Sequence, residues 1–236
     1  MTELPAPNLV QVIKDVANCL DVPENLDVTM RHITHAAQDT VHGVDYASIT
    51  VVRVGGNIES LAPTDEVAVR LDQVQSELGE GPTVEAVSAH RDVTAEHLET
   101  DSRWPRYGPL ALGLDTRAQV ALTLQRDGKT LGVLNLYSKR SGALHEAAHE
   151  VAELFAVHAA VALGYSRTIE TLHEALATRK AIGVAIGLVM GRYEVTQDAS
   201  FAFLVRVSQN SNVKLRAVCE EIVIAAQDEL TTDGKA

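Results

Sequence analysis

The chain has 236 residues, of which 46% are hydrophobic and 22% charged, so it can bury a core and is not disordered throughout. Its net charge of −12 excludes indiscriminate nucleic-acid binding by the whole surface. Residues 179–216, however, carry six cations and two anions, a net charge of +4. A basic segment on an acidic chain favours one selective polyanion site; a solvated face without a ligand is the alternative.

The two cysteines, Cys19 and Cys219, stand at opposite ends of the chain and form neither a disulfide framework nor a CxxC site. The first residues lack the basic and apolar regions of a signal peptide. The apolar-rich stretch 151–163 is interrupted by charge and is too short to cross a bilayer. We therefore expect a cytoplasmic protein that does not insert into membranes.

The N-terminal part of the chain alternates helical and strand patterns. In order, the spacing of apolar residues predicts helices over 8–20 and 26–41, a strand over 46–54, a short strand near Ile58, a helix over 66–78, a helix from Pro82, a strand over 91–93, a short helix over 101–112, and strands over 116–125 and 130–138. The Asp127-Gly128 pair predicts a tight hairpin between the last two strands. This order predicts an α+β domain built on an antiparallel sheet flanked by helices.

One long helix is predicted next, over residues 144–190. Apolar residues recur there at alternating spacings of three and four for about six heptads, which is typical of a coiled coil. The seam consists of Leu144, Ala148, Val151, Phe155, His158, Ala162, Tyr165, Ile169, Leu172, Leu176, Arg179, Gly183, Ile186 and Met190. Such a seam needs a partner helix, so we expect a homodimer through the long helix.

Two shorter helices are predicted after it and complete a three-helix bundle. An exit loop over 191–196 leads to a helix over 197–209 with Thr196 as its cap. A turn over 210–212, with Asn212 as a cap, leads to a helix over 213–230.

The basic residues of this bundle predict a phosphate site. Lys214 and Arg216 fall in the first turn of the last helix, where free backbone N–H groups also favour an anion. Arg192 and Tyr193 fall in the exit loop, where they can bind phosphate and stack on an unpaired base. The plain alternatives are that Arg192 complements a helix dipole, that Tyr193 is buried and that Arg179 packs along the seam. The remaining candidates for this surface are Arg179, Lys180 and Arg206.

The N-terminal part resembles a GAF domain over about residues 26–164. The resemblance lies in the turn Gly79-Glu80-Gly81-Pro82, the segment Asp101-Ser-Arg-Trp-Pro105 and the strand Leu131-Gly-Val-Leu-Asn-Leu-Tyr-Ser138. It implies a module that senses a signal or an unidentified small-molecule ligand; a dimerisation platform without a ligand is the alternative. Asp115-Thr-Arg-Ala-Gln119 departs from the Gly-Val-x-Ser type of sequence usual in relatives. No cysteine of the domain can tether a bilin, and we expect no cofactor.

The C-terminal part resembles an ANTAR domain over about residues 165–226. The matching positions are Arg179, Ile182, Ala185, Gly187, Met190, Asp198-Ala-Ser-Phe201, Leu204, Arg206, Ser208, Asn212, Lys214-Leu215-Arg216, Val218 and Ile222-Val223. The resemblance implies a transcription antitermination module that binds paired hairpins in nascent RNA near a terminator. Ile186 departs from the Lys or other polar residue common in relatives, which implies either altered RNA recognition or extra packing at the seam.

The segment His145-Glu-Ala-Ala-His149 matches the H-E-x-x-H pattern of zinc proteases. The third ligand of that pattern fails, because Ala152 and Phe155 stand where Gly and His are needed. We therefore expect solvated helix residues, no metal site and no catalytic residues. A zinc hydrolase using His145 and His149, a protein-interaction adaptor and a DNA-binding bundle are the rival hypotheses.

The sequence thus predicts a non-enzymatic, homodimeric GAF–ANTAR regulator. Its predicted parts are a tail and helix over 1–25, the sensor over 26–164, the RNA-binding domain over 165–226 and a C-terminal tail over 227–236, with the long helix bridging the two domains.

Overall fold

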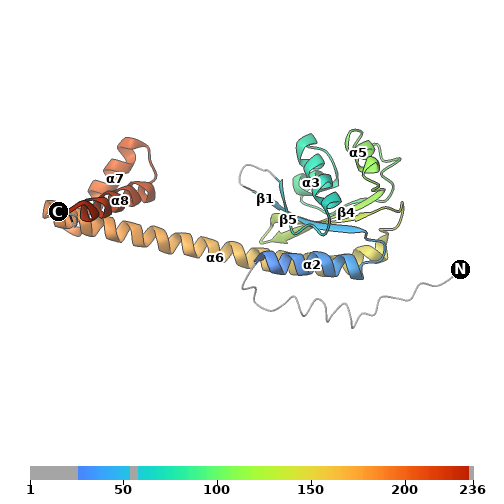
Figure 1. Cartoon of the computed structure of the whole chain (residues 1–236), viewed down its shortest axis with the longest axis horizontal. Helices are drawn as coiled ribbons and strands as arrows, with labels where there is room; N and C mark the ends of the chain where they lie inside the picture. Colours follow the sequence, from blue (N-terminus) through green and yellow to red (C-terminus); the bar gives the residue numbers. More distant parts are fainter. Residues whose placement is uncertain (1–25, 54–57, 234–236) are drawn as a thin grey trace. The chain divides into compact units, whose positions relative to one another are not determined.

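The computed structural model describes residues 26–53 and 58–233 (Figure 1). Its contacts divide the chain into two compact units, with the division between Ser166 and Arg167. The helix predicted over 8–20 and the tail over 1–25 lie outside the described residues. No helix among the described residues has the length and apolar character that a bilayer span requires.

The first unit is built on a five-stranded antiparallel sheet in the order β2-β1-β5-β4-β3. The strands are β1 (Tyr46–Val52), β2 (Ile58–Leu61), β3 (Val93–Ala95), β4 (Ala118–Arg126) and β5 (Lys129–Ser138). Asp127 and Gly128 connect β4 to β5 with φ angles of 52° and 73°, which matches the primed turn that the Asp-Gly pair predicts.

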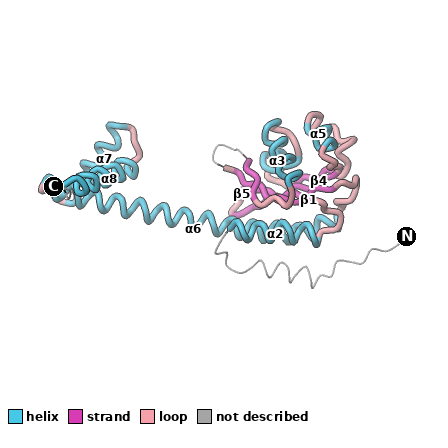
Figure 2. Tube along the Cα trace, viewed as in Figure 1, coloured by secondary structure: helices cyan, strands magenta, loops and turns pink. Residues whose placement is uncertain are grey.

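Helices cover both faces of this sheet (Figure 2). One face carries α2 (Leu26–Thr40) and the first part of α6 (Glu146–Tyr193). The other face carries α3 (Glu66–Leu78), α4 (Pro82–Ala89) and α5 (Tyr107–Gly113). Because side chains alternate along a strand, Leu134 and Leu136 of β5 join the core beneath α2 and α6, whereas Val133 and Tyr137 join the opposite core. The predicted α+β fold with an antiparallel sheet is confirmed.

The Gly79-Glu80-Gly81-Pro82 turn connects α3 to α4 and is hydrogen-bonded to the start of α5. Gly79 ends α3 with a φ of 61°, and Pro82 occupies the first turn of α4. The Glu80 carboxylate accepts the backbone N–H groups of Arg106 at 2.6 Å and Tyr107 at 2.9 Å, at the start of α5. These bonds hold the pKa of Glu80 below its usual value, and the bond from the Tyr107 N–H has the largest effect. The helix α5 begins at Tyr107, so its predicted start at residue 101 is wrong.

That region forms a turn instead, because the Asp101 side chain competes for the backbone. Oδ1 of Asp101 accepts the Arg103 N–H at 3.1 Å, a local bond that favours a turn over a helix. The Arg103 guanidinium then lies 4.1 Å from the centroid of the Trp104 ring, which is buried.

The first half of α6 packs into the first unit, which corrects the prediction of a dimer seam along the whole helix. Ala148, Ala152, Phe155 and Ala162 belong to the core that α6 shares with α2 and the sheet. The seam positions change character from Tyr165 onwards, where four successive members are exposed: Tyr165 57%, Ile169 46%, Leu172 58% and Leu176 63%. Heptad spacing alone does not distinguish a helix that packs on a sheet of the same chain from a helix that pairs with a second chain.

The second unit contains the end of α6 with α7 (Gln197–Ser211) and α8 (Leu215–Asp233). Ala185 and Val189 of α6 meet Leu204 of α7 and Cys219 of α8 in a small core. The Thr196 side chain accepts the Ala199 N–H at 3.3 Å, so the predicted cap of α7 is confirmed.

Two predicted boundaries of this unit are wrong. The helix α6 continues to Tyr193, so Arg192 and Tyr193 lie in its last turn and not in an exit loop. Asn212 has a φ of 54° and closes α7, because its N–H donates to the carbonyls of Gln209 and Ser208; it does not cap α8. Asparagine tolerates this left-handed conformation at helix C-termini, and α8 therefore starts at Leu215, two residues later than predicted.

Candidate nucleic-acid interface and sensor core

Lys214 stands at the N-terminus of α8, immediately before its first helical residue. The Val218 N–H donates to the Lys214 carbonyl at 3.2 Å, which is the first helical hydrogen bond of α8. The amides of residues 215–217 therefore have no carbonyl partner within the helix and point out of its N-terminus. An exposed lysine beside three such N–H groups is suited to an anion such as a phosphate.

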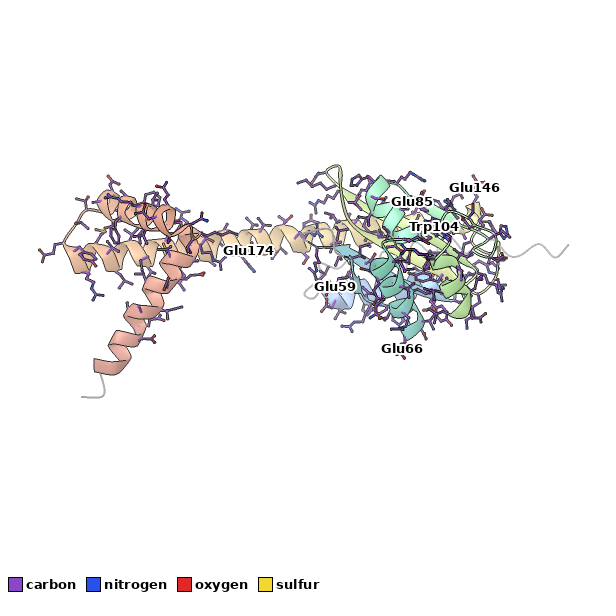
Figure 3. All side chains as sticks on the ribbon, turned by 90° about the horizontal axis from the view of Figure 1, so that it is seen from above. Glu59, Glu66, Glu85, Trp104, Glu146 and Glu174 are labelled. Atoms are coloured by element: carbon purple, nitrogen blue, oxygen red, sulfur yellow. The ribbon has the colours of Figure 1, made fainter. Side chains whose placement is uncertain are left out.

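Arg216 lies in the first turn of the same helix but is engaged by acidic side chains. Its Nε lies 2.7 Å from Oε1 of Glu220, and the two side chains are 41% and 44% exposed. The hydrogen bond with Glu220, followed by the charges of Glu220 and Glu174, raises the pKa of Arg216. Glu174 projects from α6 and is labelled in Figure 3. A phosphate at Arg216 would compete with the Glu220 carboxylate for this guanidinium.

Arg192 and Tyr193 line a groove of about 910 Å³ between α6, α7 and α8. The Tyr193 ring lies 6.0 Å from the Phe203 ring, centroid to centroid, at an interplanar angle of 45°. Tyr193 is 60% exposed, so it is not the buried core residue of the plain alternative. The groove is also lined by the apolar side chains of Val207 and Ile222 and by the acidic Glu221, from α7 and α8.

The remaining three basic candidates are exposed at other places on the second unit. Arg206 follows the buried Leu204 by two residues, or about 200° around α7, so it faces solvent. Arg179 and Lys180 are exposed on α6. Ile186 is half-buried and packs against the core of the bundle. The seven predicted residues thus occupy the start of α8, the groove, the outer face of α7 and the body of α6.

A network of buried polar side chains lies in the first unit, on the sheet face beneath α3, α4 and α5. Asp72 of α3 is at its centre: Oδ1 accepts hydrogen bonds from Tyr137 at 2.5 Å and Ser48 at 3.1 Å, and Oδ2 accepts one from Ser60 at 2.6 Å. Asn135 donates to the same Oδ1 at 3.3 Å. The network therefore joins α3 to three neighbouring strands, β2, β1 and β5.

The network continues toward α4 and α5 through a chain of side-chain hydrogen bonds. Thr83 donates to Asn135 at 2.8 Å, Gln119 donates to Thr83 at 3.1 Å, and Tyr107 donates to Gln119 at 2.7 Å. All four side chains are buried. Buried polar groups cost free energy unless they are hydrogen-bonded, so this connected set specifies one arrangement of the helices over the sheet.

Burial raises the pKa of Asp72 to about 6, although hydrogen bonds from Ser60, Tyr137 and Ser48 oppose that rise. Asp72, Ser60, Ile58 and Glu77 are among the residues that line a cavity of about 190 Å³. This set of polar residues is not among those predicted from the sequence. The available signal was the run of polar residues at alternate positions of apolar strands, Ser48 and Thr50 in β1, Gln119 in β4 and Asn135 in β5.

Comparison with known families agrees with this architecture. The profile of the GAF domain family matches residues 23–164, which include the sheet and its flanking helices. The chain belongs to the GAF domain family. The profile of the ANTAR domain matches residues 170–223, so the GAF domain is followed by an ANTAR domain. This pair of domains fits a regulatory protein that responds to a signal. No curated protein sequence matches the chain significantly.

Solved structures share the fold of the GAF domain. The GAF domain of a phosphoenolpyruvate-protein phosphotransferase from Coxiella burnetii is 15% identical, with a TM-score of 0.58 over 71% of this chain and 99% of that one. A free methionine-R-sulfoxide reductase from Neisseria meningitidis, in complex with its substrate, is 12% identical, with a TM-score of 0.52 over 67% and 89%. A type II free methionine-R-sulfoxide reductase from Thermoplasma acidophilum is 17% identical, with a TM-score of 0.51 over 61% and 95%. At these identities the likeness shows the fold alone.

Proposed function

We propose that this GAF–ANTAR protein is a cytoplasmic, non-enzymatic regulator that binds paired hairpins in nascent RNA and promotes transcription antitermination. The observation that carries the proposal is the exposed Lys214 beside the open N-terminus of α8, inside the segment that matches the ANTAR domain. A cation and free N–H groups in one place suit a phosphate of the RNA backbone.

The groove supports a second contact with RNA. Unpaired bases of RNA loops stack on exposed aromatic side chains, and Tyr193 offers such a ring beside Arg192. Arg179, Lys180 and Arg206 are exposed cations that would add sequence-independent phosphate contacts. In this proposal, Lys214 and Arg216 position the backbone while Tyr193 engages a loop base.

Two copies of the chain would present two RNA sites, which suits a target of two hairpins. The exposed apolar residues Tyr165, Ile169, Leu172 and Leu176 on α6 support a homodimer through this part of the helix. Linking two sites raises the overall affinity when both hairpins are reached together, without any new contact.

The GAF domain would supply the control. Its buried network around Asp72, with the adjoining cavity, is suited to a small polar ligand that exchanges hydrogen bonds with Ser60 and Asp72. A ligand that prefers one arrangement of α3 over the sheet would shift the population of that arrangement.

Fluorescence anisotropy of the full chain tests the output. The RNAs are a two-hairpin RNA, a one-hairpin RNA and a DNA duplex of equal length, each titrated over a series of salt concentrations. We expect the tightest binding to the two-hairpin RNA, with an affinity that falls as salt rises. Equal binding to all three would contradict paired-hairpin recognition. Binding of a protein partner that does not depend on salt, without RNA binding, would favour the adaptor hypothesis, in which the apolar groove holds a helix.

A further inference from the structure

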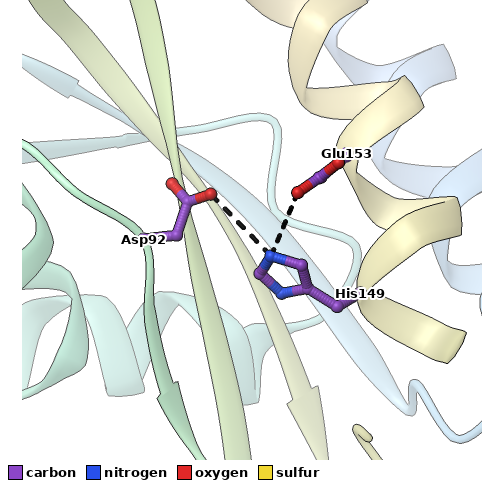
Figure 4. A group of neighbouring side chains, drawn as sticks. All are labelled: Asp92, His149 and Glu153. Carbon is purple, nitrogen blue, oxygen red and sulfur yellow. Dashed lines mark ion pairs between the residues drawn. The ribbon is translucent and has the colours of Figure 1, made fainter. Parts of the chain in front are cut away.

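The two histidines of the His145-Glu-Ala-Ala-His149 motif have different surroundings. His149 points toward the strands, and its Nε2 lies 3.3 Å from Oε1 of Glu153 and 3.8 Å from Oδ2 of Asp92 (Figure 4). Asp92 precedes β3, whereas His149 and Glu153 are one turn apart on α6. His145 is exposed and does not belong to this cluster of ligand atoms. The prediction that His149 is simply a solvated residue is therefore wrong, and the paired histidines of a zinc protease do not form.

The distances within this cluster fit a small metal ion. Zinc binds histidine nitrogen and carboxylate oxygen at about 2.0–2.2 Å, so two ligands of a tetrahedral site lie about 3.4 Å apart. Nε2 of His149 lies 3.3 Å from the Glu153 oxygen and 3.8 Å from the Asp92 oxygen, distances that bracket this value, and all three ligand atoms lie within 4.8 Å of one another. One imidazole and two carboxylates favour a first-row divalent metal, because oxygen and nitrogen ligands suit these ions.

The Asp92 carboxylate is held in position by the neighbouring strand. Its Oδ1 accepts hydrogen bonds from the backbone N–H of Thr123 at 2.7 Å and from the Thr123 hydroxyl at 2.8 Å. These bonds leave Oδ2 directed at His149. Such outer hydrogen bonds orient metal-binding carboxylates and are typical of built sites. They also mean that Asp92 is fixed before any ion arrives.

Two of the three residues, Asp92 and Glu153, face a groove that opens to solvent. Asp92 and Glu153 line a groove of about 660 Å³ between β4 and α6, and the Glu153 side chain is 57% exposed. A cation can enter from this side, and water can complete the coordination that three protein ligands leave open.

We propose that Asp92, His149 and Glu153 bind one first-row divalent metal ion, and that the ion fastens the start of α6 to β3 and β4 of the GAF domain. The ion replaces a histidine–carboxylate contact with bonds that cross from the helix to the sheet. Since α6 continues into the ANTAR domain, the site lies on the element that leaves the sensor. The proposal is independent of RNA binding.

Zinc binding to the untagged full chain tests the proposal by equilibrium dialysis and elemental analysis. We expect one zinc ion per chain and a higher melting temperature of the GAF domain with zinc, since a ligand of the native state stabilises it. Glu153→Gln and His149→Gln should each weaken binding by on the order of tenfold or more, and Thr123→Val by about tenfold through the freed Asp92 carboxylate. Glu153 is exposed, so its variant keeps the fold and separates a lost ligand from unfolding.

The matched control is His145→Gln, which removes an exposed imidazole four residues from His149. This variant should bind zinc as the unmodified chain does. Two results would overturn the proposal: no stoichiometric binding of zinc, manganese, cobalt or nickel by the unmodified chain, or equal loss of binding in the His145 and His149 variants. The second result would assign the metal to histidines scattered over the surface.

Discussion

Tyr137 donates a 2.5 Å hydrogen bond from its hydroxyl group to Oδ1 of Asp72, and both side chains are buried. This bond connects the central strand β5 to α3, and Ser48 and Ser60 bring β1 and β2 to the same carboxyl group. The negative charge on Asp72 in turn contributes, after burial, to raising the pKa of Tyr137. A protonatable group thus sits where the sheet and the helix above it meet, beside a cavity.

The buried Asp72 predicts a pH dependence of the stability of the GAF domain. Its pKa in the folded protein is about 6, against 3.8 for the free side chain, so folding disfavours the ionised form. The stabilisation from its protonated form is fully present below about pH 4 and is lost as the pH rises through about 6. Relative to the Asp72→Asn variant, which cannot ionise at this position, the free energy of unfolding of the natural domain should fall by about 2 kcal/mol between about pH 4.5 and about pH 7.5.

Urea unfolding followed by the fluorescence of Trp104, the only tryptophan, measures this difference, because that residue is buried in the GAF domain. Asparagine can keep an oxygen toward Tyr137 and Ser48 and turn its amide toward Ser60, so the network survives. The control is Asp39→Asn on the exposed face of α2, which should follow the pH dependence of the unmodified chain. Parallel pH profiles for the natural chain and the Asp72 variant would contradict a raised pKa.

Local sequence patterns predict the fold of the first unit, but they do not predict the buried polar network around Asp72. Alternation in the strands and the Asp127-Gly128 turn predicted the sheet, because those signals arise within a few residues. Ser60 and Asn135 reach Asp72 only after α3 packs on the sheet, and contacts between residues 12 and 63 apart in sequence leave no local trace in the sequence.

The second unit shows the same limit at the ends of its helices. The sequence predicts Lys214 and Arg216 near the start of α8, where they lie in the structure. Their surroundings were not predictable, because the pairing of Arg216 with Glu220 depends on rotamers and the closure of α7 by Asn212 depends on a left-handed backbone. The cluster of Asp92, His149 and Glu153 is likewise not predictable from the sequence, since Asp92 lies 57 residues before His149 and reaches it only through the fold.

Lys214→Ala should weaken binding of the full chain to the two-hairpin RNA and reduce the slope of log affinity against log salt by about one unit. Arg216→Ala should have a smaller effect on the slope, because Glu220 already offsets its charge. Glu220→Gln should strengthen binding, since it releases the Arg216 guanidinium. Anisotropy over a salt series measures all three.

The control for these variants is Lys129→Ala, which removes an exposed cation from the β4–β5 hairpin of the GAF domain. It should leave both affinity and slope unchanged. If Lys129 and Lys214 prove equivalent, RNA binding depends on total charge and the site at the start of α8 is wrong.

Gly81→Ala should destabilise the GAF domain far more than Gly79→Ala, although both glycines lie in one turn. Gly81 has a φ of 133°, and an added Cβ would lie 2.5 Å from Cγ of Gln75, a buried residue. Gly79 has a φ of 61°, and an added Cβ meets no atom within 4 Å. We expect the free energy of unfolding to fall by on the order of 3 kcal/mol for Gly81→Ala and by about 1 kcal/mol for Gly79→Ala. Urea unfolding followed by Trp104 fluorescence measures both values. Equal losses of stability would show that the contact with Gln75 has no effect and that the backbone conformation alone determines the cost of each substitution.

Leu172→Lys should convert the proposed dimer to a monomer. Leu172 is 58% exposed and lies at the middle of the apolar stripe from Tyr165 to Leu176, so a lysine there would place a charge inside a helix–helix seam. Sedimentation equilibrium should show the mass of two chains for the natural protein and of one chain for the variant. The helix itself should persist, because lysine is a good helix former at an exposed position.

The matched control is Ala177→Lys, which adds the same charge to an exposed position of the same helix. Residue 177 is five positions from Leu172, or about 140° around the helix, and so lies off the stripe. This variant should remain a dimer and keep its preference for the two-hairpin RNA. The Leu172 variant should lose that preference while retaining binding to one hairpin, because avidity requires two linked sites and each ANTAR domain keeps its own surface. A dimeric Leu172 variant would exclude the stripe as the interface.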